Sequence, residues 1–499
     1  MGGRAQTADP LTYGGGFLVT GNYVAGSVDL NDSLNPPDPN GLATGTIHIT
    51  GVPADADIIS ANLFWESLTF TADPSQAAAT FRGTTLDLSD GVAVKKSHQD
   101  LAGNVANCWT SGQPVTMWRF RADVLRLLPV RFDKDNHPTT KRLVNDADLT
   151  AHSLPLHTVS LPTRNGNQLP ESAGATLVIV YRDPSQPLRK IVFYDGIHIQ
   201  SSLTDTMTQT LRGIYRSSAA KSASITTLLG AGQPNNNEQV LFNDGTETLI
   251  SPPNPVFGGS SSERSWSALT YDVSALMTPG NNSSGGFGET ATAKIRHLPG
   301  GGDDCLTLEG IIFSTAVADA DPNSDGGPAG DGIPDGIEDA VGGLTDANGE
   351  PLPNLNAMGA SSAHRDLFIE FNAMVAAPGT TYGSLSAPYD ATHTSVTDVL
   401  GHTHMPTPEV LKWIGDSYAG HGIAAHFDVG PLDNSGGTCD GPGLPACYRS
   451  LGVIPHADWV DDYTSLAADA YLVPTNLARG GEIIKETGCD PANAACPGR

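Results

Sequence analysis

Apolar residues up to about residue 318 recur in short runs that turn residues separate. Thr44–Thr50 alternates small or polar residues with apolar ones, and Ile58–Phe70 repeats this alternation after a turn. Ala175–Tyr181 and Lys190–Ile199 form a second pair of apolar runs. β-Branched runs that recur roughly every ten positions are typical of antiparallel sandwiches and barrels. The pattern predicts a mainly β protein with one or two antiparallel β-sandwich domains.

A short internal repeat bears on how the β region is divided. Phe120–Leu127 resembles Tyr271–Leu276, and a tryptophan precedes each segment. The repeat indicates two related sandwich halves, 12–165 and 170–318. A single pair of segments also fits a chance match.

The pattern changes after residue 318. Residues 319–360 are rich in Gly, Asp and Pro and lack hydrophobic periodicity, which is typical of a linker. Asp366–Phe371 and His421–Val429 then have the composition of strands, and Thr407–Ala419 has apolar residues at helical spacing. Strand, helix and strand in this order predict a βαβ unit. We therefore expect residues 361–499 to form a small α/β unit with disulfide loops.

The charge balance limits the partners. The chain of 499 residues has 27 Lys plus Arg against 54 Asp plus Glu, which gives a formal net charge of −27. Such a surface repels nucleic acid and anionic lipid and attracts cations. Residues 298–364 contain 12 acidic residues and no Lys or Arg. No apolar run reaches the length of about 18 residues that predicts a transmembrane helix.

The acidic linker contains the clearest candidate metal site. Oxygen-bearing side chains occupy every second position from Asp319 to Asp325, and a glycine follows them. A second acidic run extends from Asp331 to Asp339. This spacing lets a tight loop direct alternate oxygens onto a hard cation. The predicted calcium ligands are Asp319, Asp321, Asn323, Asp325, Asp331, Asp335, Glu338 and Asp339.

Calcium fits the linker better than zinc or magnesium. The segment has no His or Cys, which zinc favours, and magnesium keeps more of its water. An EF-hand loop that starts at Asp321 would need a Glu at its last position, where the chain has Gly332. The segment is therefore more similar to the loops of thrombospondin type 3 repeats. An acidic flexible linker that binds nothing is the alternative.

Histidines within the predicted α/β unit offer another candidate site. His402 and His404 alternate on an extended segment, and His426 and Asp428 alternate on the predicted strand that follows. These groups could serve a zinc ion or a general base, or they could be surface or hydrogen-bonding residues. The sequence contains no HExxH helix, nucleophile elbow or Gly-rich phosphate loop, so no motif supports a zinc site.

Cysteine usage favours an oxidising compartment. An even number of cysteines fits three disulfides, with buried free thiols as the alternative. Met1–Pro10 lacks the apolar core of a signal peptide, so an exported protein would carry its signal upstream. We expect a secreted or cell-surface location. The six cysteines are Cys108, Cys305, Cys439, Cys447, Cys489 and Cys496.

Three segments occur in an order that resembles large secreted bacterial zinc-metallopeptidase-like proteins. They are Leu306–Asp339, Asp366–Met374 and Gly401–Gly430. The resemblance implies a β-rich front that leads through an acidic calcium loop into an α/β peptidase-like region. In that family an HExxH helix would follow the βαβ unit, and this sequence has none. The resemblance therefore implies the non-catalytic front part of a longer enzyme, and it assigns no zinc ligand to any residue here.

The sequence leaves three functions open. The first is an extracellular calcium-binding β-sandwich protein, the accessory N-terminal part of a secreted metallopeptidase-like protein. The second is a structural or adhesive cell-surface protein that binds glycans or neighbouring subunits. The third is a metal-dependent hydrolase that uses the region of His402 and His404.

A structural calcium loop predicts a response to chelators. Because a bound cation stabilises only the ordered loop, its removal should make the linker more accessible to proteases. We expect a chelator to accelerate limited proteolysis near Gly327, which fragment masses would locate. Cleavage at the same rate with and without the chelator would contradict the calcium loop.

Overall fold

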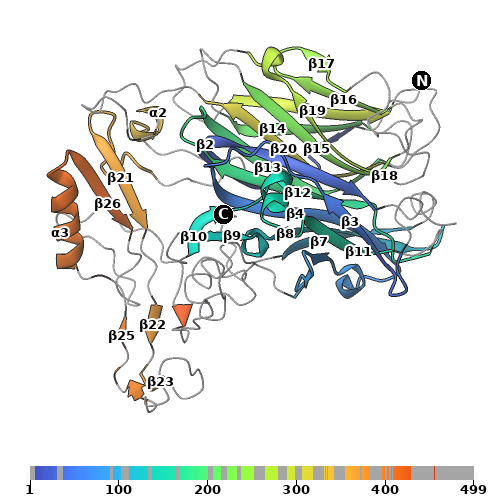
Figure 1. Ribbon diagram of the computed structural model, residues 1–499. Coiled ribbons are helices and arrows are strands. Elements are labelled where there is room, and N and C mark those ends of the chain that lie inside the picture. Colours follow the sequence, from blue (N-terminus) through green and yellow to red (C-terminus); the bar gives the residue numbers. More distant parts are fainter. Residues whose placement is uncertain are drawn as a thin grey trace.

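The computed structural model is mainly β, as predicted, and large antiparallel sheets form most of it (Figure 1). The structure describes residues 6–30, 37–89, 94–102, 112–132, 138–163, 168–200, 206–214, 222–232, 238–251, 265–278, 289–297, 306–317, 331, 333, 335–341, 354–370, 374–376, 378–382, 396–398, 400, 402–403, 406, 408–428 and 454–455.

A nine-stranded antiparallel sheet runs through the whole β region. The order of its strands is β18-β15-β20-β13-β2-β12-β4-β8-β7. The strands are β2 (Thr12–Asp29), β4 (Asp57–Thr69), β7 (Val94–Leu101), β8 (Val115–Asp123), β12 (Gly174–Arg182), β13 (Leu188–Gln200), β15 (Ala223–Gly232), β18 (Ser265–Asp272) and β20 (Leu306–Ala316).

Strand β2 belongs to both halves of this sheet. Its residues 12–20 pair with β13, and its residues 21–29 pair with β12. Gly21 lies where the partner changes, and a Cβ atom there would lie 2.0 Å from the carbonyl oxygen of Tyr181. A residue without a side chain is therefore required at the changeover.

The two halves of the nine-stranded sheet pack face to face across an inner layer of side chains. Tyr23 Oη of β2 lies 2.8 Å from Thr226 Oγ1 of β15, and Trp266 Nε1 of β18 donates a hydrogen bond of 2.8 Å to Thr176 Oγ1 of β12. The buried apolar residues of the inner layer are Val19, Tyr23, Phe64, Ala173, Val178, Val180, Ile191, Phe193, Leu228, Trp266 and Ile312.

Two further sheets cover the outer faces, so the molecule has four layers (Figure 1). Alternation along β4 sends Leu63 and Trp65 into one outer core and Phe64 into the inner layer. The first outer sheet contains β3 (Leu42–Ile47), β11 (His157–Pro162), β5 (Thr80–Phe81) and β6 (Thr84–Thr85). The second contains β1 (Gln6–Ala8), β14 (Thr206–Ile214), β19 (Glu289–His297), β16 (Glu238–Asn243) and β17 (Glu247–Leu249).

The two segments of the internal repeat adopt the same local structure. Each follows a strand of the nine-stranded sheet and continues through a buried valine into a 3₁₀ turn, Leu125–Leu127 in one case and Ser274–Leu276 in the other. In both, the preceding aspartate accepts a hydrogen bond of 2.9 Å from the first backbone N–H of the turn.

The predicted boundary near residue 170 falls inside one continuous sheet. β12, which the sequence assigns to the second half, pairs with β2 and β4, and its alternate residues Ala175, Leu177 and Ile179 pack in the first outer core. The physical reason is that pairing partners, not chain order, decide which core a strand joins. Hydrophobic alternation identifies a strand but not its neighbour.

The remaining small elements connect or flank these sheets. They are a short helix with two neighbouring strands, a 3₁₀ turn after β4, and three short strand pairings near the C-terminal unit. Their bounds are η1 (Pro74–Ala77), β9 (Val130–Phe132), β10 (Pro138–Arg142), α1 (Asp146–Ala151), β22 (Met374–Ala376), β23 (Thr380–Tyr382), β24 (Val396–Asp398), β25 (His402–Thr403) and β27 (Ile454–Pro455).

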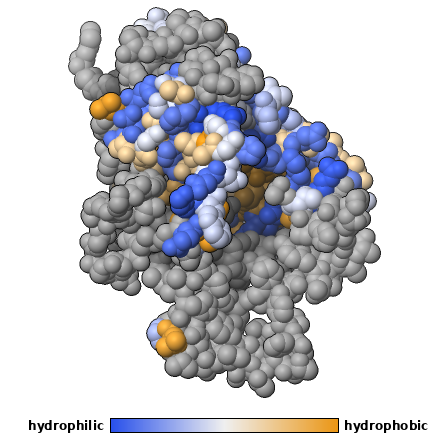
Figure 2. Space-filling view, turned by 90° about the vertical axis from the view of Figure 1, so that its left-hand side faces the viewer, coloured by the Kyte–Doolittle hydropathy of each residue, from blue (hydrophilic) through white to orange (hydrophobic). Residues whose placement is uncertain are grey.

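The predicted βαβ unit is confirmed. β21 (Arg365–Glu370) and β26 (Ile423–Asp428) pair in parallel, and α3 (Pro408–Ala419) connects them. Leu411 of α3 is buried, and the helix packs on β26. Figure 2 shows the side of the molecule that carries this unit, where described residues are mostly hydrophilic and apolar ones form small patches.

The sequence also predicts disulfides and no transmembrane helix. All six cysteines lie outside the described residues, so the predicted disulfides stay a prediction. Within the described residues, every helix is too short or too polar to cross a bilayer.

His157 of β11 is a buried histidine that the fold holds neutral. Its Nε2–H donates a hydrogen bond of 2.8 Å to the carbonyl oxygen of Val144, which leaves Nδ1 to accept from Arg82 Nη1 at 3.1 Å. Burial lowers the pKa of His157 from 6.5 to about 4, and the charge of Arg82 acts in the same direction. Protonation would place a second cation beside the guanidinium group.

The neutral histidine predicts acid destabilisation. Because the pKa of His157 is lower in the folded state, its contribution is complete above about pH 6.5 and is lost towards about pH 4, a loss of order 3 kcal/mol. His157→Gln should have a lower free energy of unfolding at neutral pH but a shallower decline in acid. Denaturant titrations across this range would measure both effects, with exposed His421→Gln as the control. Parallel curves for His157→Gln and wild type would contradict the assignment.

Candidate metal centre

The structure describes half of the predicted calcium ligands. Asp331, Asp335, Glu338 and Asp339 are described, and α2 (Asp335–Glu338) carries two of them. The other four lie outside the described residues and stay predictions: Asp319, Asp321, Asn323 and Asp325.

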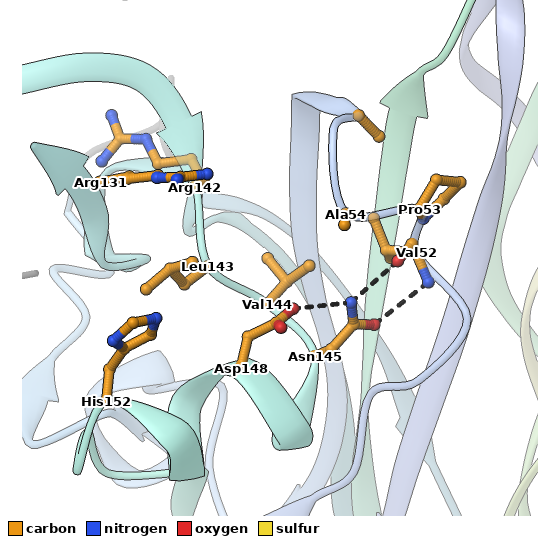
Figure 3. Close-up of a pocket in the computed structure, with 11 residues that line it drawn as sticks. Val52, Pro53, Ala54, Arg131, Arg142, Leu143, Val144, Asn145, Asp148 and His152 are labelled. Atoms are coloured by element: carbon orange, nitrogen blue, oxygen red, sulfur yellow. Dashed lines mark hydrogen bonds between the residues drawn. The ribbon is translucent and has the colours of Figure 1, made fainter. Parts of the chain in front are cut away.

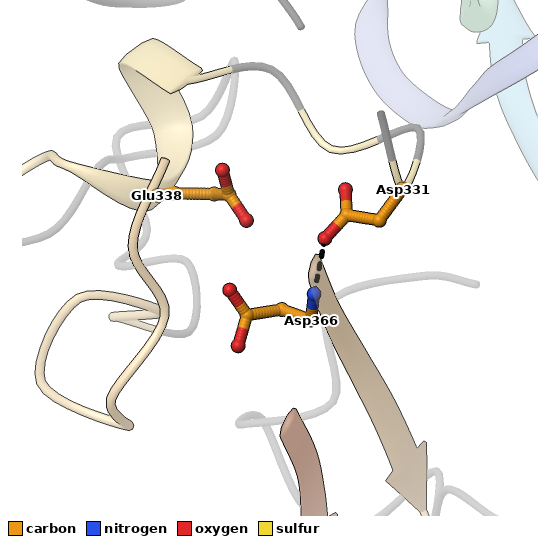
Figure 4. Close-up of side chains that lie close together, drawn as sticks. All are labelled: Asp331, Glu338 and Asp366. Carbon is orange, nitrogen blue, oxygen red and sulfur yellow. Dashed lines mark hydrogen bonds between the residues drawn. The ribbon is translucent and has the colours of Figure 1, made fainter. Parts of the chain in front are cut away.

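Three carboxylates from separate parts of the chain meet at one place. Asp331, Glu338 and Asp366 each offer an oxygen, and these oxygens all lie within 4.8 Å of one another. Glu338 comes from α2 and Asp366 from the start of β21 (Figure 4). The side chains of Glu338 and Asp366 are fully buried. We call these three residues the carboxylate cluster.

Backbone hydrogen bonds fix the position of Asp331. Its Oδ1 accepts a bond of 2.8 Å from the backbone N–H of Ile333, which forms a tight local turn. Its Oδ2 accepts from the backbone N–H of Asp366, as Figure 4 shows. The segment of Asp331 is thereby joined to the start of strand β21.

Two histidines contact the carboxylate of Asp366. His426 of β26 donates from Nε2 to Asp366 Oδ1 at 2.5 Å, and its ring stacks on Phe368 with 4.5 Å between centroids. Nδ1 of His364 lies 3.0 Å from Asp366 Oδ2, which also accepts from the backbone N–H of Ser361 at 3.1 Å. Asp366 therefore has a fixed orientation, as is typical of metal ligands with supporting partners.

The other two described candidates lie outside the carboxylate cluster. Asp339 bonds to Ser362, from the backbone N–H at 3.2 Å and from the hydroxyl at 2.7 Å. Asp335 begins α2, where its carbonyl oxygen accepts from the backbone N–H of Asp339 at 2.9 Å. Neighbouring acidic residues of one run therefore have different roles.

The chemistry of the carboxylate cluster suits a hard divalent cation. Three carboxylates carry a formal charge of −3, and burial of two of them without compensation is costly. Oxygen-only ligands favour calcium, magnesium or manganese over zinc. The residues present fit such an ion.

The sequence pattern did not place Asp366 among the candidate ligands. The residue opens a run of apolar positions, and the pattern identified that run only as a buried strand. An acidic residue at the first position of a buried strand was the available signal, because a buried carboxylate requires a partner.

The histidine site is only partly described. The side chains of His402 and Asp428 and the whole of His404 lie outside the described residues. His426 has a defined place, and it is the partner of Asp366.

A separate cavity of about 130 Å³ lies beside α1 (Figure 3). The amide of Asn145 fixes one wall, since it bonds to the N–H and carbonyl of Val52 at 3.1 and 2.9 Å and to Asp148 at 3.0 Å. Arg131 and Arg142 form the opposite wall. None of the predicted site residues lines this cavity.

Comparisons with known proteins give little functional information. A family model described as "Protein of unknown function (DUF3344)" matches residues 156–290, less than half of the chain. Among curated proteins, nothing matches the chain. A solved structure titled "Recombinant peptide: N-glycanase F (PNGase F)" is similar at 11% identity over 59% of this chain and 96% of that chain, with a TM-score of 0.16. A TM-score this low supports no conclusion about fold or activity.

Proposed function

We propose that this protein is an extracellular calcium-binding β-sandwich protein whose cation occupies the carboxylate cluster. One observation carries the proposal: three carboxylate oxygens converge within 4.8 Å, and two of the residues are buried. Calcium takes about six to eight oxygens, which carboxylates supply singly or in pairs. The predicted ligands Asp319–Asp325 precede Asp331 closely in sequence and would add to this set.

The bound ion would have a structural role. Asp366 begins β21, and its partner His426 belongs to β26, so both strands of the α/β unit are connected to the carboxylate cluster. Asp331 and Glu338 belong to the acidic linker. Calcium would neutralise the cluster and thereby hold the linker against the first strand of the α/β unit.

The sequence order supports a wider assignment. A β-rich front, an acidic loop and a βαβ unit are consistent with the accessory part of a secreted metallopeptidase-like protein. The strong negative charge suits a calcium-rich extracellular medium.

Adjacent residues of α2 and the turn after it provide a matched test. Glu338→Gln removes an oxygen ligand from the carboxylate cluster, whereas Asp339→Asn changes a side chain that bonds to Ser362. We expect Glu338→Gln to weaken calcium binding at least about tenfold, and Asp339→Asn to leave it nearly unchanged. Isothermal titration calorimetry on chelator-treated protein would measure the affinities.

Stability gives a second readout of the same site. Calcium at about a hundred times its dissociation constant should raise the free energy of unfolding of the wild type by about 2.7 kcal/mol. Asp366→Asn should remove most of this gain. If calcium produces no heat and no thermal shift in the wild type, the proposed function is wrong.

A further inference from the structure

Five charged residues lie within the inner layer, between the two halves of the nine-stranded sheet. Along β4, Phe64, Glu66 and Leu68 share one face, since they are two residues apart. Phe64 belongs to the apolar inner layer, and Leu68 belongs to a second apolar cluster with Met117 and Ile199. The charged group therefore lies between two apolar patches. Its members, all at most 7% exposed, are Glu66, Arg119, Arg121, Asp195 and Glu309.

Asp195 of β13 is paired with both arginines of β8. Its Oδ1 lies 2.5 Å from Arg119 Nη2, and its Oδ2 lies 2.6 Å from Arg121 Nη1. Arg121 Nη2 also donates a bond of 2.9 Å to the carbonyl oxygen of Gly14. One carboxylate thus faces two guanidinium groups, which leaves one positive charge to be balanced within the inner layer.

Glu66 and Glu309 form a contact between β4 and β20. Their carboxyl groups lie within hydrogen-bonding reach of each other. Glu66 Oε2 accepts a bond of 2.7 Å from Thr307 Oγ1, and its Oε1 lies where a Cβ on Gly230 would stand. Among the described residues, no N–H or O–H group donates to either oxygen of Glu309. The remaining hydrogen-bond donor is therefore a proton on one of the two carboxyl groups.

A count of charge leads to the same result. Two guanidinium groups and three ionised carboxylates would leave the buried group with a net charge of −1, whereas one bound proton makes it neutral. Two other charged groups are close: Lys95 at the exposed edge strand β7, and Glu171, whose charge also disfavours ionisation of Glu66. A neutral buried cluster is far less costly than an uncompensated buried charge.

We propose that Glu66 and Glu309 share one proton and act as a pH-sensitive lock between the two halves of the nine-stranded sheet. With the proton in place, a carboxyl–carboxylate hydrogen bond joins β4 to β20 across the inner layer. When the proton leaves, two negative charges remain in contact without water, and the two halves are held together less strongly. The lock does not depend on the carboxylate cluster or on calcium.

Burial accounts for the proton affinity of the pair. It raises the pKa of Glu66 to about 7 and raises the pKa of Glu309 well above its usual value, to which the charge of Glu66 contributes. Because these values are raised in the folded state, the contribution to stability is complete below the usual glutamate pKa of about 4.5. It is lost as the pH rises through the raised folded-state pKa values, which are about 7 for Glu66 and well above the usual value for Glu309.

Denaturant titrations in the presence of a chelator test the lock. Between about pH 5 and about pH 8, we expect wild-type stability to fall with a slope that corresponds to about one proton released on unfolding. Glu309→Gln supplies a permanent N–H donor to Glu66, so its stability should change less with pH and exceed that of the wild type near about pH 8. Glu409→Gln, an exposed substitution on α3, should follow the wild-type curve.

Infrared spectroscopy can detect the shared proton directly, independently of any effect on stability. The wild type should show a protonated carboxylic acid band at neutral pH that Glu309→Gln lacks. Glu66→Gln is the second variant, in case Glu309→Gln does not fold, and it should also lack the band. A wild type without the band, or variants with the same pH dependence as the wild type, would overturn the proposal.

Discussion

The packing of the nine-stranded sheet against itself is the interaction on which the other layers depend. Both outer sheets contain short strands, and two strands of the first have only two residues each. They are stable because each covers one half of a sheet whose other face is already buried. Strand β2 joins the halves covalently and by hydrogen bonds on both sides, so neither half can separate without breaking its ladder.

Two buried titratable sites give this fold a preferred range of pH. His157 in the first outer core must be neutral, and its environment becomes unfavourable in acid. The Glu66–Glu309 pair in the inner layer holds a proton, and its environment becomes unfavourable in alkali. The opposite signs follow from one cause, since burial disfavours the charged form of each group. The layered packing thus favours a mildly acidic to neutral medium.

Much of the fold could be predicted from the sequence, because alternation and helical spacing are local properties. The strands at Ile58–Phe70 and Ala175–Tyr181 and the βαβ unit follow from such patterns. The domain boundary does not follow from local patterns, because strand pairing is non-local. Glu309 of β20 gives another example. It stands among apolar residues in the sequence, and only the burial of both faces of the sheet shows that its carboxyl group needs a hydrogen-bond partner.

The candidate metal centre could likewise be predicted only in part from the sequence. Asp331 and Glu338 belong to an acidic run that the spacing identifies, whereas Asp366 comes from a strand further along the chain. Proximity in sequence also misleads, because Asp339 follows Glu338 directly and bonds to Ser362 instead. A contiguous pattern can indicate that a cation site exists, but the fold decides which oxygens share it.

Every one of the eleven residues of β20 is buried, although antiparallel strands usually have one face in water. This strand is hydrogen-bonded on both sides, to β13 and β15. Its amide hydrogens can therefore exchange with solvent only when the inner layer and an outer core open together. The exchange rate of β20 amides thus reports the global stability of the β region, separately from the fluctuations of the strands at its edges.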